Sequence, residues 1–328
     1  MMQPSTDWRE RPSADEAARH VADAARLVAL QRTVSGSQGN GRALHRKQLI
    51  ALRATLRVHD GLPAHARHGL FGAPGPHMAW VRLSNGGTHV RSDRAPDIRG
   101  FALRVFGVRG AGALGGTTTH QDLLLINKTA FAFPDSRPFV GLVEAAGAGG
   151  GAILLWALRS FGPLRMFGVL KRLAATQSQP FDGFAAEPFN TCAPLRCGPY
   201  AVRARLLPPP GQGAAAPGRD WGDDLADRLA KGPLIWRLQL QFFVDEARTP
   251  IEDASVDWPE SVAPYLTVAD LVVEPQDLHD PTALAFVQQV ETSTFDPWQA
   301  LEEHRPLGEV MRARKVAYFE RQKARGAV

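Results

Sequence analysis

The sequence is poor in cysteine, with only Cys192 and Cys197 among its 328 residues. Two thiols cannot build a disulfide framework or a four-thiolate metal site, so we expect both to be free. Any metal chemistry must therefore use other ligands or a bound cofactor.

Long apolar runs are also scarce. The N-terminal segment lacks the uninterrupted apolar stretch of a secretory signal, and no run approaches the length that we would expect of a membrane-spanning helix. We therefore expect a soluble, cytoplasmic protein. The chain is 44% hydrophobic and 22% charged, which is ordinary for a globular protein whose core is large enough to enclose a cofactor.

The positive charge is dispersed along the chain. A net charge of +5 and a pI near 9.5 favour an anionic partner, such as nucleic acid, a phospholipid surface or a carboxylate ligand. The arginines form no basic run interleaved with stacking aromatics, so we expect no nucleic-acid binding. The carboxylates of a cofactor or a fatty acid would need only a few of them.

Several segments show the periodicity of regular structure. Residues 13–34 carry helix formers at helical spacing, and SGSQGNG at 35–41 is expected to end this helix. Short alternating segments between 50 and 108, and again at 121–133, predict strands joined by turns. The expected fold class is α+β: an antiparallel β core with an N-terminal helical extension over 1–40, a helical insert and C-terminal helices.

The predicted insert, residues 152–176, is apolar but carries four basic residues, and Gly162-Pro163 breaks its middle. This pattern predicts two short amphipathic helices. They form either a hairpin packed on the β core, or a basic and apolar face that contacts lipid or gates a hydrophobic channel.

A phenol flanked by guanidinium groups is expected on the last helix. Arg314, Tyr318 and Arg325 fall within about 40° of one another on a helical projection. A nearby arginine favours the phenolate form of tyrosine, and a phenolate is a competent axial ligand for ferric haem. Taken alone, the same pattern is also typical of a basic surface helix.

Three other segments place polar residues in unusual surroundings. His45 follows Arg42 by three positions, Arg82 lies within an otherwise apolar strand, and Asn127 interrupts an apolar run. An arginine in a strand is usually exposed, whereas a buried amide needs a hydrogen-bond partner.

Taken together and in this order, these segments resemble the haem catalases. The R-x-x-H-x-K pattern of that family is matched by Arg42, His45 and Lys47. Its V-R-F-S strand resembles residues 81–84, and its D-x-R-G-F-A element matches residues 97–102.

The resemblance continues toward the C-terminus. The family's distal asparagine aligns with Asn127, ahead of an aromatic run and Asp135, and its R-x-x-x-Y motif falls on residues 314–318, with Arg325 seven residues beyond. PIEDASVDWPE at 250–260 and HRPLG at 304–308 are similar to motifs of the minimal-length, catalase-related branch.

The chain also departs from the family. Leu44 stands before the distal histidine, where the family usually has valine, or threonine in oxylipin-forming members. Leucine cannot hydrogen-bond as threonine does, which favours peroxide chemistry. No resemblance covers residues 1–38.

The resemblance implies a β-barrel of the catalase type over 41–328 that binds haem b (iron protoporphyrin IX). Tyr318 would ligate the iron, and His45 and Asn127 would act on the bound peroxide. The residues implied to contact the cofactor are Arg42, Arg82, Ser84, Phe139, Arg314, Tyr318 and Arg325, with Arg42, Arg82 and Arg325 pairing with the haem propionates.

The implied function is a haem oxidoreductase that acts on hydrogen peroxide or an organic hydroperoxide. The scaffold alone does not select among the possible substrates. The alternatives are a fatty-acid oxygenase or hydroperoxide-converting enzyme, and a non-catalytic haem-binding or sensing protein. We also expect a homo-oligomer and a peripheral membrane contact through residues 152–176. A zinc site is disfavoured because the loop histidines match no compact ligand pattern: His59, His65, His68 and His77.

Overall fold

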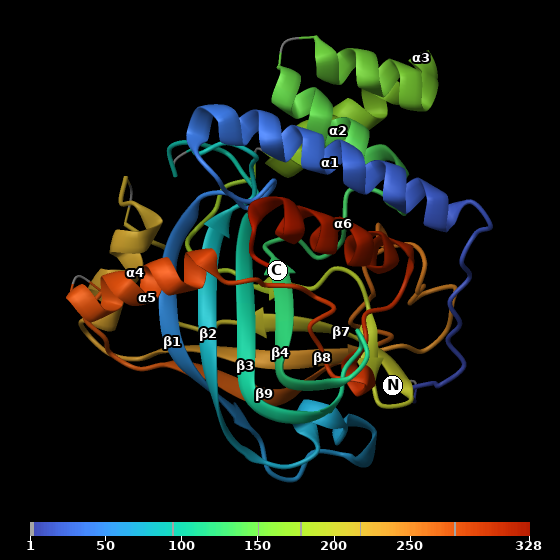
Figure 1. Cartoon of the computed structure of the whole chain (residues 1–328). Coiled ribbons are helices and arrows are strands. Elements are labelled where there is room, and N and C mark those ends of the chain that lie inside the picture. The colour runs from blue at the N-terminus through green and yellow to red at the C-terminus, as the bar shows by residue number, and fades with distance from the viewer. Residues whose placement is uncertain (1–2, 94, 150, 178, 217, 279) are drawn as a thin grey trace.

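An antiparallel sheet forms the body of the protein (Figure 1). The computed structural model describes residues 3–93, 95–149, 151–177, 179–216, 218–278 and 280–328. The strands in these ranges are β1 (Gln48–Val58), β2 (Gly75–Asn85), β3 (Arg99–Ala111), β4 (Thr117–Ile126), β5 (Phe189–Asn190), β6 (Leu195–Cys197), β7 (Tyr200–Leu207), β8 (Leu234–Phe242) and β9 (Tyr265–Val273).

The sheet closes on itself through its shortest strand. The strand order is β5-β4-β3-β2-β1-β9-β8-β7-β6, and β5 also pairs with β7. Asn190 faces Ile126 of β4 and Arg205 of β7, so eight strands form a closed barrel while β6 extends β7 outside the ring. The expected α+β architecture with an antiparallel β-barrel is confirmed.

The side chains of β2 alternate between the two faces of the sheet, so one strand contributes both apolar side chains to the barrel core and an arginine to the opposite face. Val81 and Leu83 are fully buried in the barrel core. Successive side chains of a strand point to opposite faces, so Arg82 points away from that core. It reaches the helix Pro281–Thr292, whose Glu291 it contacts.

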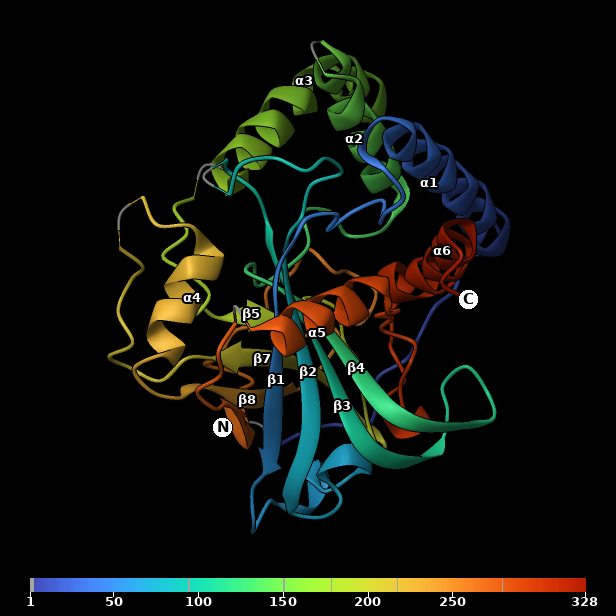
Figure 2. The ribbon, with the colours of Figure 1, turned by 60° about the vertical axis from the view of Figure 1, so that its left-hand side comes forward.

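The α-helices are α1 (Glu16–Gln38), α2 (Arg137–Ala148), α3 (Ala152–Gln177), α4 (Trp221–Leu229), α5 (Pro281–Thr292) and α6 (Glu309–Arg325). Helices α1, α2, α3 and α6 cover one end of the barrel, whereas α4 and α5 lie along its side (Figures 1 and 2). An apolar cluster joins α1, α2 and α6 through Leu27, Val140, Val143 and Ala317. The N-terminal helix is therefore packed against the C-terminal one.

Two predicted boundaries are wrong. The first helix continues through residues 35–38 and ends at Gly39, with a φ of 78°, because Val34 is buried and Ser37 Oγ donates to its carbonyl. The Ser and Gly residues of this segment favour the end of a helix, but tertiary packing keeps the segment helical. The strand expected at 121–133 ends at Ile126, since the side chain of Asn127 accepts the backbone N–H of Arg99 in the neighbouring β3 in place of a backbone carbonyl.

The insert contains the predicted break. Gly162 has a φ of 72° and a ψ of 170°, and Pro163 follows it, so α3 consists of two helical pieces. Taken across this break, Ala152–Thr176 is by length and composition alone apolar enough to cross a membrane, with a mean hydropathy of 1.3 in an 18-residue window. The expectation that no segment approaches this length is wrong, because that window holds no more than two charged residues.

Candidate functional site

All of the site residues that the sequence indicates line one cavity. It has a volume of about 950 Å³ and lies between the barrel and the covering helices α1, α2, α3 and α6. The indicated residues on its wall are Arg42, His45, Arg82, Ser84, Asn127, Phe139, Arg314, Tyr318 and Arg325. Residues separated by almost 300 positions thus share one site.

The ring of His45 lies against Gly100 of β3 and beside Ser84 of β2. Its backbone has a φ of 51°, and its N–H donates to the carbonyl of Gly86 at 3.0 Å. Its Nδ1 lies 3.1 Å from Ser84 Oγ. A Cβ at Gly100 would fall 2.4 Å from that same nitrogen, so only glycine leaves space for the ring at this point of β3.

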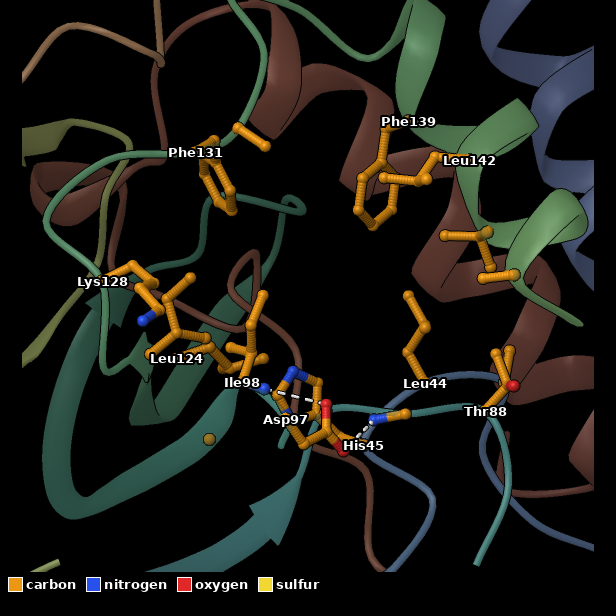
Figure 3. A pocket seen from close by; sticks show the side chains of 18 of the residues that line it. Leu44, His45, Thr88, Asp97, Ile98, Leu124, Lys128, Phe131, Phe139 and Leu142 are labelled. Carbon is orange, nitrogen blue, oxygen red and sulfur yellow. Dashed lines mark hydrogen bonds between the residues drawn. The ribbon is translucent and has the colours of Figure 1, made fainter. Parts of the chain in front are cut away.

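Asp97 holds the loop that positions His45. One carboxylate oxygen accepts the N–H of Gly87 at 2.9 Å, and the other accepts the N–H of Ile98 at 2.8 Å (Figure 3). The backbone N–H of Gly86 donates to the Ile98 carbonyl at 2.7 Å. The D-x-R-G motif therefore fixes the loop through its aspartate and clears space for the imidazole through its glycine.

His45 is held in its neutral form. Burial, together with the positive charge of Arg82 and Arg314, lowers its pKa to about 3. In the neutral tautomer whose Nδ1 donates to Ser84 Oγ, Nε2 is unprotonated and can take up a proton.

Asn127 follows the last residue of β4 and is oriented by the neighbouring strand. Its Oδ1 accepts the backbone N–H of Arg99 at 2.8 Å, and its own N–H donates to the Arg99 carbonyl at 3.2 Å. The amide group is thereby oriented so that its NH₂ is the remaining donor. The Asn127 side chain also lowers the pKa of Glu187, whereas burial of that carboxyl raises it with the larger effect.

Tyr318 lies on α6 between two arginines. Arg314 donates to its phenol oxygen at 3.0 Å, and Arg321 lies over its ring at 4.7 Å. Burial alone would raise the phenol's pKa, yet the pKa is lowered because both arginines stabilise the phenolate. The expected contact with Arg314 is present, whereas Arg325 contacts other groups.

Three arginines gather at the end of α5, and two of them pair with the carboxylate of Glu291. Arg82 donates to Glu291 Oε2 at 2.9 Å and Arg42 to Oε1 at 2.7 Å. Arg42 and Arg325 also donate to the Ser293 carbonyl, at 2.7 and 3.1 Å. Burial lowers the pKa of Arg42 and of Arg325 to about 10, so both stay charged at neutral pH. The cluster has an excess of two positive charges, which fits a ligand with two carboxylates.

The remaining wall is mostly apolar. Figure 3 shows Phe131, Phe139 and Leu142 facing Leu44 and His45 across the open space. The wall continues to residues of α1 and α3, so the N-terminal helix and the insert both close this cavity. A large apolar chamber with a few convergent polar groups is the usual form of a cofactor or small-molecule site.

The segments at 250–260 and 304–308 support the start of α6. Glu252 accepts the backbone N–H of Glu309 at 2.9 Å and pairs with Arg312 at 2.9 Å. A Cβ at Gly308, whose φ is 86°, would fall 2.4 Å from the Ile251 carbonyl oxygen. PIEDASVDWPE and HRPLG thus meet and set the position of the helix that carries Tyr318.

Solved structures of catalases are similar to this chain over almost its whole length. A fungal catalase matches 99% of this chain with a TM-score of 0.69 and 16% sequence identity. A bacterial catalase matches 98%, with a TM-score of 0.66 and 15% identity. Catalase A from Saccharomyces cerevisiae matches 99%, with a TM-score of 0.68 and 14% identity. This chain has the catalase fold.

The chain is shorter than these proteins of the catalase fold. It spans 65%, 63% and 68% of their respective lengths. No family sequence model matches the chain, and no curated protein matches it significantly by sequence. At such low identity the likeness describes the fold, and the chemistry must be argued from the cavity itself.

Arg321 in the cavity wall and Glu291, which pairs with two arginines of that wall, were not indicated by the sequence. Arg321 follows Tyr318 by three residues, a spacing that places both on one helical face, so periodicity alone would have found it. Glu291 stands in no motif that marks it as the partner of the distant Arg42 and Arg82. Its role follows only from the approach of α5 to β2.

Proposed function

We propose that this chain binds haem b in the cavity and acts on peroxides as a minimal-length, catalase-like oxidoreductase. The observation that carries the proposal is a phenol held toward its ionised form by two arginines, in the same cavity as a neutral histidine. A phenolate is a known ligand of ferric haem, and the excess of two positive charges around Glu291 suits two propionates.

Each group has a distinct task in this proposal. Tyr318 would hold the iron, Arg314 and Arg321 would keep its oxygen ionised, and Arg42, Arg82 and Arg325 would hold the propionates. Bound haem would supply the redox chemistry that cleaves the peroxide O–O bond. Phe139 and Leu44 present apolar surface to the cavity and would exclude water from it.

His45 and Asn127 would act on the bound peroxide. Nε2 of the neutral His45 would accept the proton of the inner peroxide oxygen and return it to the outer oxygen, which leaves as water or an alcohol. The Asn127 amide would donate a hydrogen bond to the peroxide and hold it in position. When hydrogen peroxide is both the oxidant and the reductant, two molecules of hydrogen peroxide yield two molecules of water and one molecule of dioxygen.

The test measures turnover of the haem-loaded protein. Oxygen evolution from hydrogen peroxide, and oxidation of a phenol by an organic hydroperoxide, are compared between the native chain and His45→Gln. We expect at least a hundredfold loss in the variant, in line with removal of a positioned general base. His59→Gln, whose partner Asp270 lies away from the cavity, is the matched control. Absence of turnover with every peroxide in the native protein refutes the enzyme proposal and favours a haem carrier or sensor.

A fatty acid or its hydroperoxide is the second candidate substrate. The observation in its favour is the apolar extension of the cavity toward α3, where Ile153, Val169 and Leu173 form the wall beside the basic Arg172. Such a chamber suits an alkyl chain with a carboxylate at one end. Product analysis after incubation with linoleate or its hydroperoxide tests this candidate. Recovery of unchanged substrate beside rapid hydrogen peroxide turnover rejects it.

A further inference from the structure

We propose that the two helical pieces of α3 form a docking surface for an anionic phospholipid membrane. The helix lies at the outer edge of the molecule, beyond α1 and α2 and far from the opposite end of the barrel (Figures 1 and 2). The proposal does not depend on haem or on any activity of the cavity.

Exposed apolar side chains are concentrated on α3. Five of the thirteen large apolar side chains that are exposed among the described residues belong to it: Leu154, Leu155, Leu158, Leu164 and Phe167. Leu164 is 95% exposed and Phe167 is 68% exposed. The helix also has a buried face, where Trp156 and Met166 pack in an apolar cluster. A helix with apolar residues on its exposed side as well calls for a further apolar partner.

The charges beside this apolar face have one sign. Arg159, Arg165, Lys171 and Arg172 are exposed, and within the described ranges none of them makes an ion pair. No aspartate or glutamate occurs between Glu144 and Asp182. Lysine and arginine flanking bulky apolar residues on a helix are typical of helices that lie in the interface of anionic membranes.

The charge distribution argues against a second copy of this chain as the partner. A two-fold contact through α3 would bring the same cationic residues of both copies together, with no carboxylate of the segment to neutralise them. An anionic lipid surface supplies both the apolar layer and the opposite charge. We therefore assign the lipid surface as the occupant.

The same helices also close the cavity. Ile153, Val169 and Leu173 line the cavity wall, while Leu164 and Phe167 point outward. Docking through the outward face would place the wall of the cavity next to the lipid headgroups. An apolar compound dissolved in the membrane would then have a short path to the chamber.

The proposal is tested by sedimentation with vesicles. The full-length protein is mixed with phosphatidylcholine vesicles with or without about one third phosphatidylglycerol, at salt concentrations of about 0.1 M and about 0.5 M. We expect binding to the anionic vesicles only, and weaker binding at the higher salt concentration. The triple variant R159Q/R165Q/K171Q should bind about a hundredfold more weakly, since each basic residue contributes about fivefold.

Matched variants distinguish binding through this surface from nonspecific adsorption to the vesicles. Leu164→Ser with Phe167→Ser should reduce binding at least tenfold, because both side chains enter the apolar layer. Leu114→Ser removes an equally bulky exposed residue from the turn between β3 and β4, and R109Q/K231Q/R237Q removes three exposed charges elsewhere. Both controls should bind like the native protein.

Two results would overturn the proposal. One is equal binding to neutral and anionic vesicles, or no binding to either. The other is a native dimer that the Leu164→Ser and Phe167→Ser changes dissociate in analytical ultracentrifugation, while vesicle binding is unaffected. In that case α3 is covered by a second copy of the chain.

Discussion

Gly100 offers a direct way to displace His45 without removing it. In β3 it pairs with Ser84 of β2, and the imidazole lies against it. A Cβ placed there falls 2.4 Å from Nδ1, 2.6 Å from Cε1 and 2.8 Å from Ser84 Oγ, whereas an ordinary contact is 3.4 Å or longer. Gly100→Ala must therefore push the ring away by about 1 Å.

The cost of such a shift can be estimated. A displacement of about 1 Å at a catalytic group typically reduces the rate about a hundredfold. We therefore predict that kcat/KM for hydrogen peroxide falls about a hundredfold in the haem-loaded Gly100→Ala variant. Crowding of this core position should also lower the free energy of unfolding by about 1–3 kcal/mol.

The assay combines turnover with chemical denaturation. Haem absorbance should be unchanged, because the variant does not touch Tyr318 or its arginines. Gly36→Ala is the control, since a Cβ at that position meets nothing within 4 Å. A Gly100→Ala protein that keeps a kcat/KM within twofold of the native value would refute the assigned position and role of His45.

Three further predictions follow from charge and packing. The pKa of His45 is lowered to about 3, so between pH 6.5 and about 3 the unfolded chain binds more protons than the folded chain. The free energy of unfolding should therefore fall as the pH falls through this window. His45→Gln should weaken that pH dependence in urea titrations. Glu291→Gln leaves Arg42 and Arg82 without their shared carboxylate, so the haem-free protein should lose about 1–3 kcal/mol of unfolding free energy, and added haem should restore much of it in thermal melts. Gly308→Ala should cost about 3 kcal/mol in denaturant unfolding, because its Cβ would meet the rigid backbone of Ile251; a loss below 1 kcal/mol would contradict the close approach.

Local patterns were sufficient for much of the fold. Alternation placed β1, β2 and β3, and the Gly162-Pro163 pair placed the break in α3. The helical spacing of Arg314 and Tyr318 predicted their contact, because two residues four positions apart share one face of a helix. These features depend on neighbours in the sequence.

Features that depend on distant packing were not predictable in the same way. The role of Glu291 requires α5 to lie against β2, and the role of Gly100 requires the His45 ring to lie on β3. The first helix exceeds its expected end because burial of Val34 outweighs the local Ser and Gly signals. A single sequence shows the residue types at such places, but their roles come from contacts between remote segments.

The central claim is that Tyr318 ligates a haem iron, and the optical spectrum of the haem-supplied protein tests it most directly. We predict a ferric haem spectrum with phenolate charge-transfer bands that disappear in Tyr318→Phe and persist in Tyr200→Phe, whose ring lies outside the cavity wall. A colourless protein, or a spectrum that Tyr318→Phe leaves unchanged, would contradict the account.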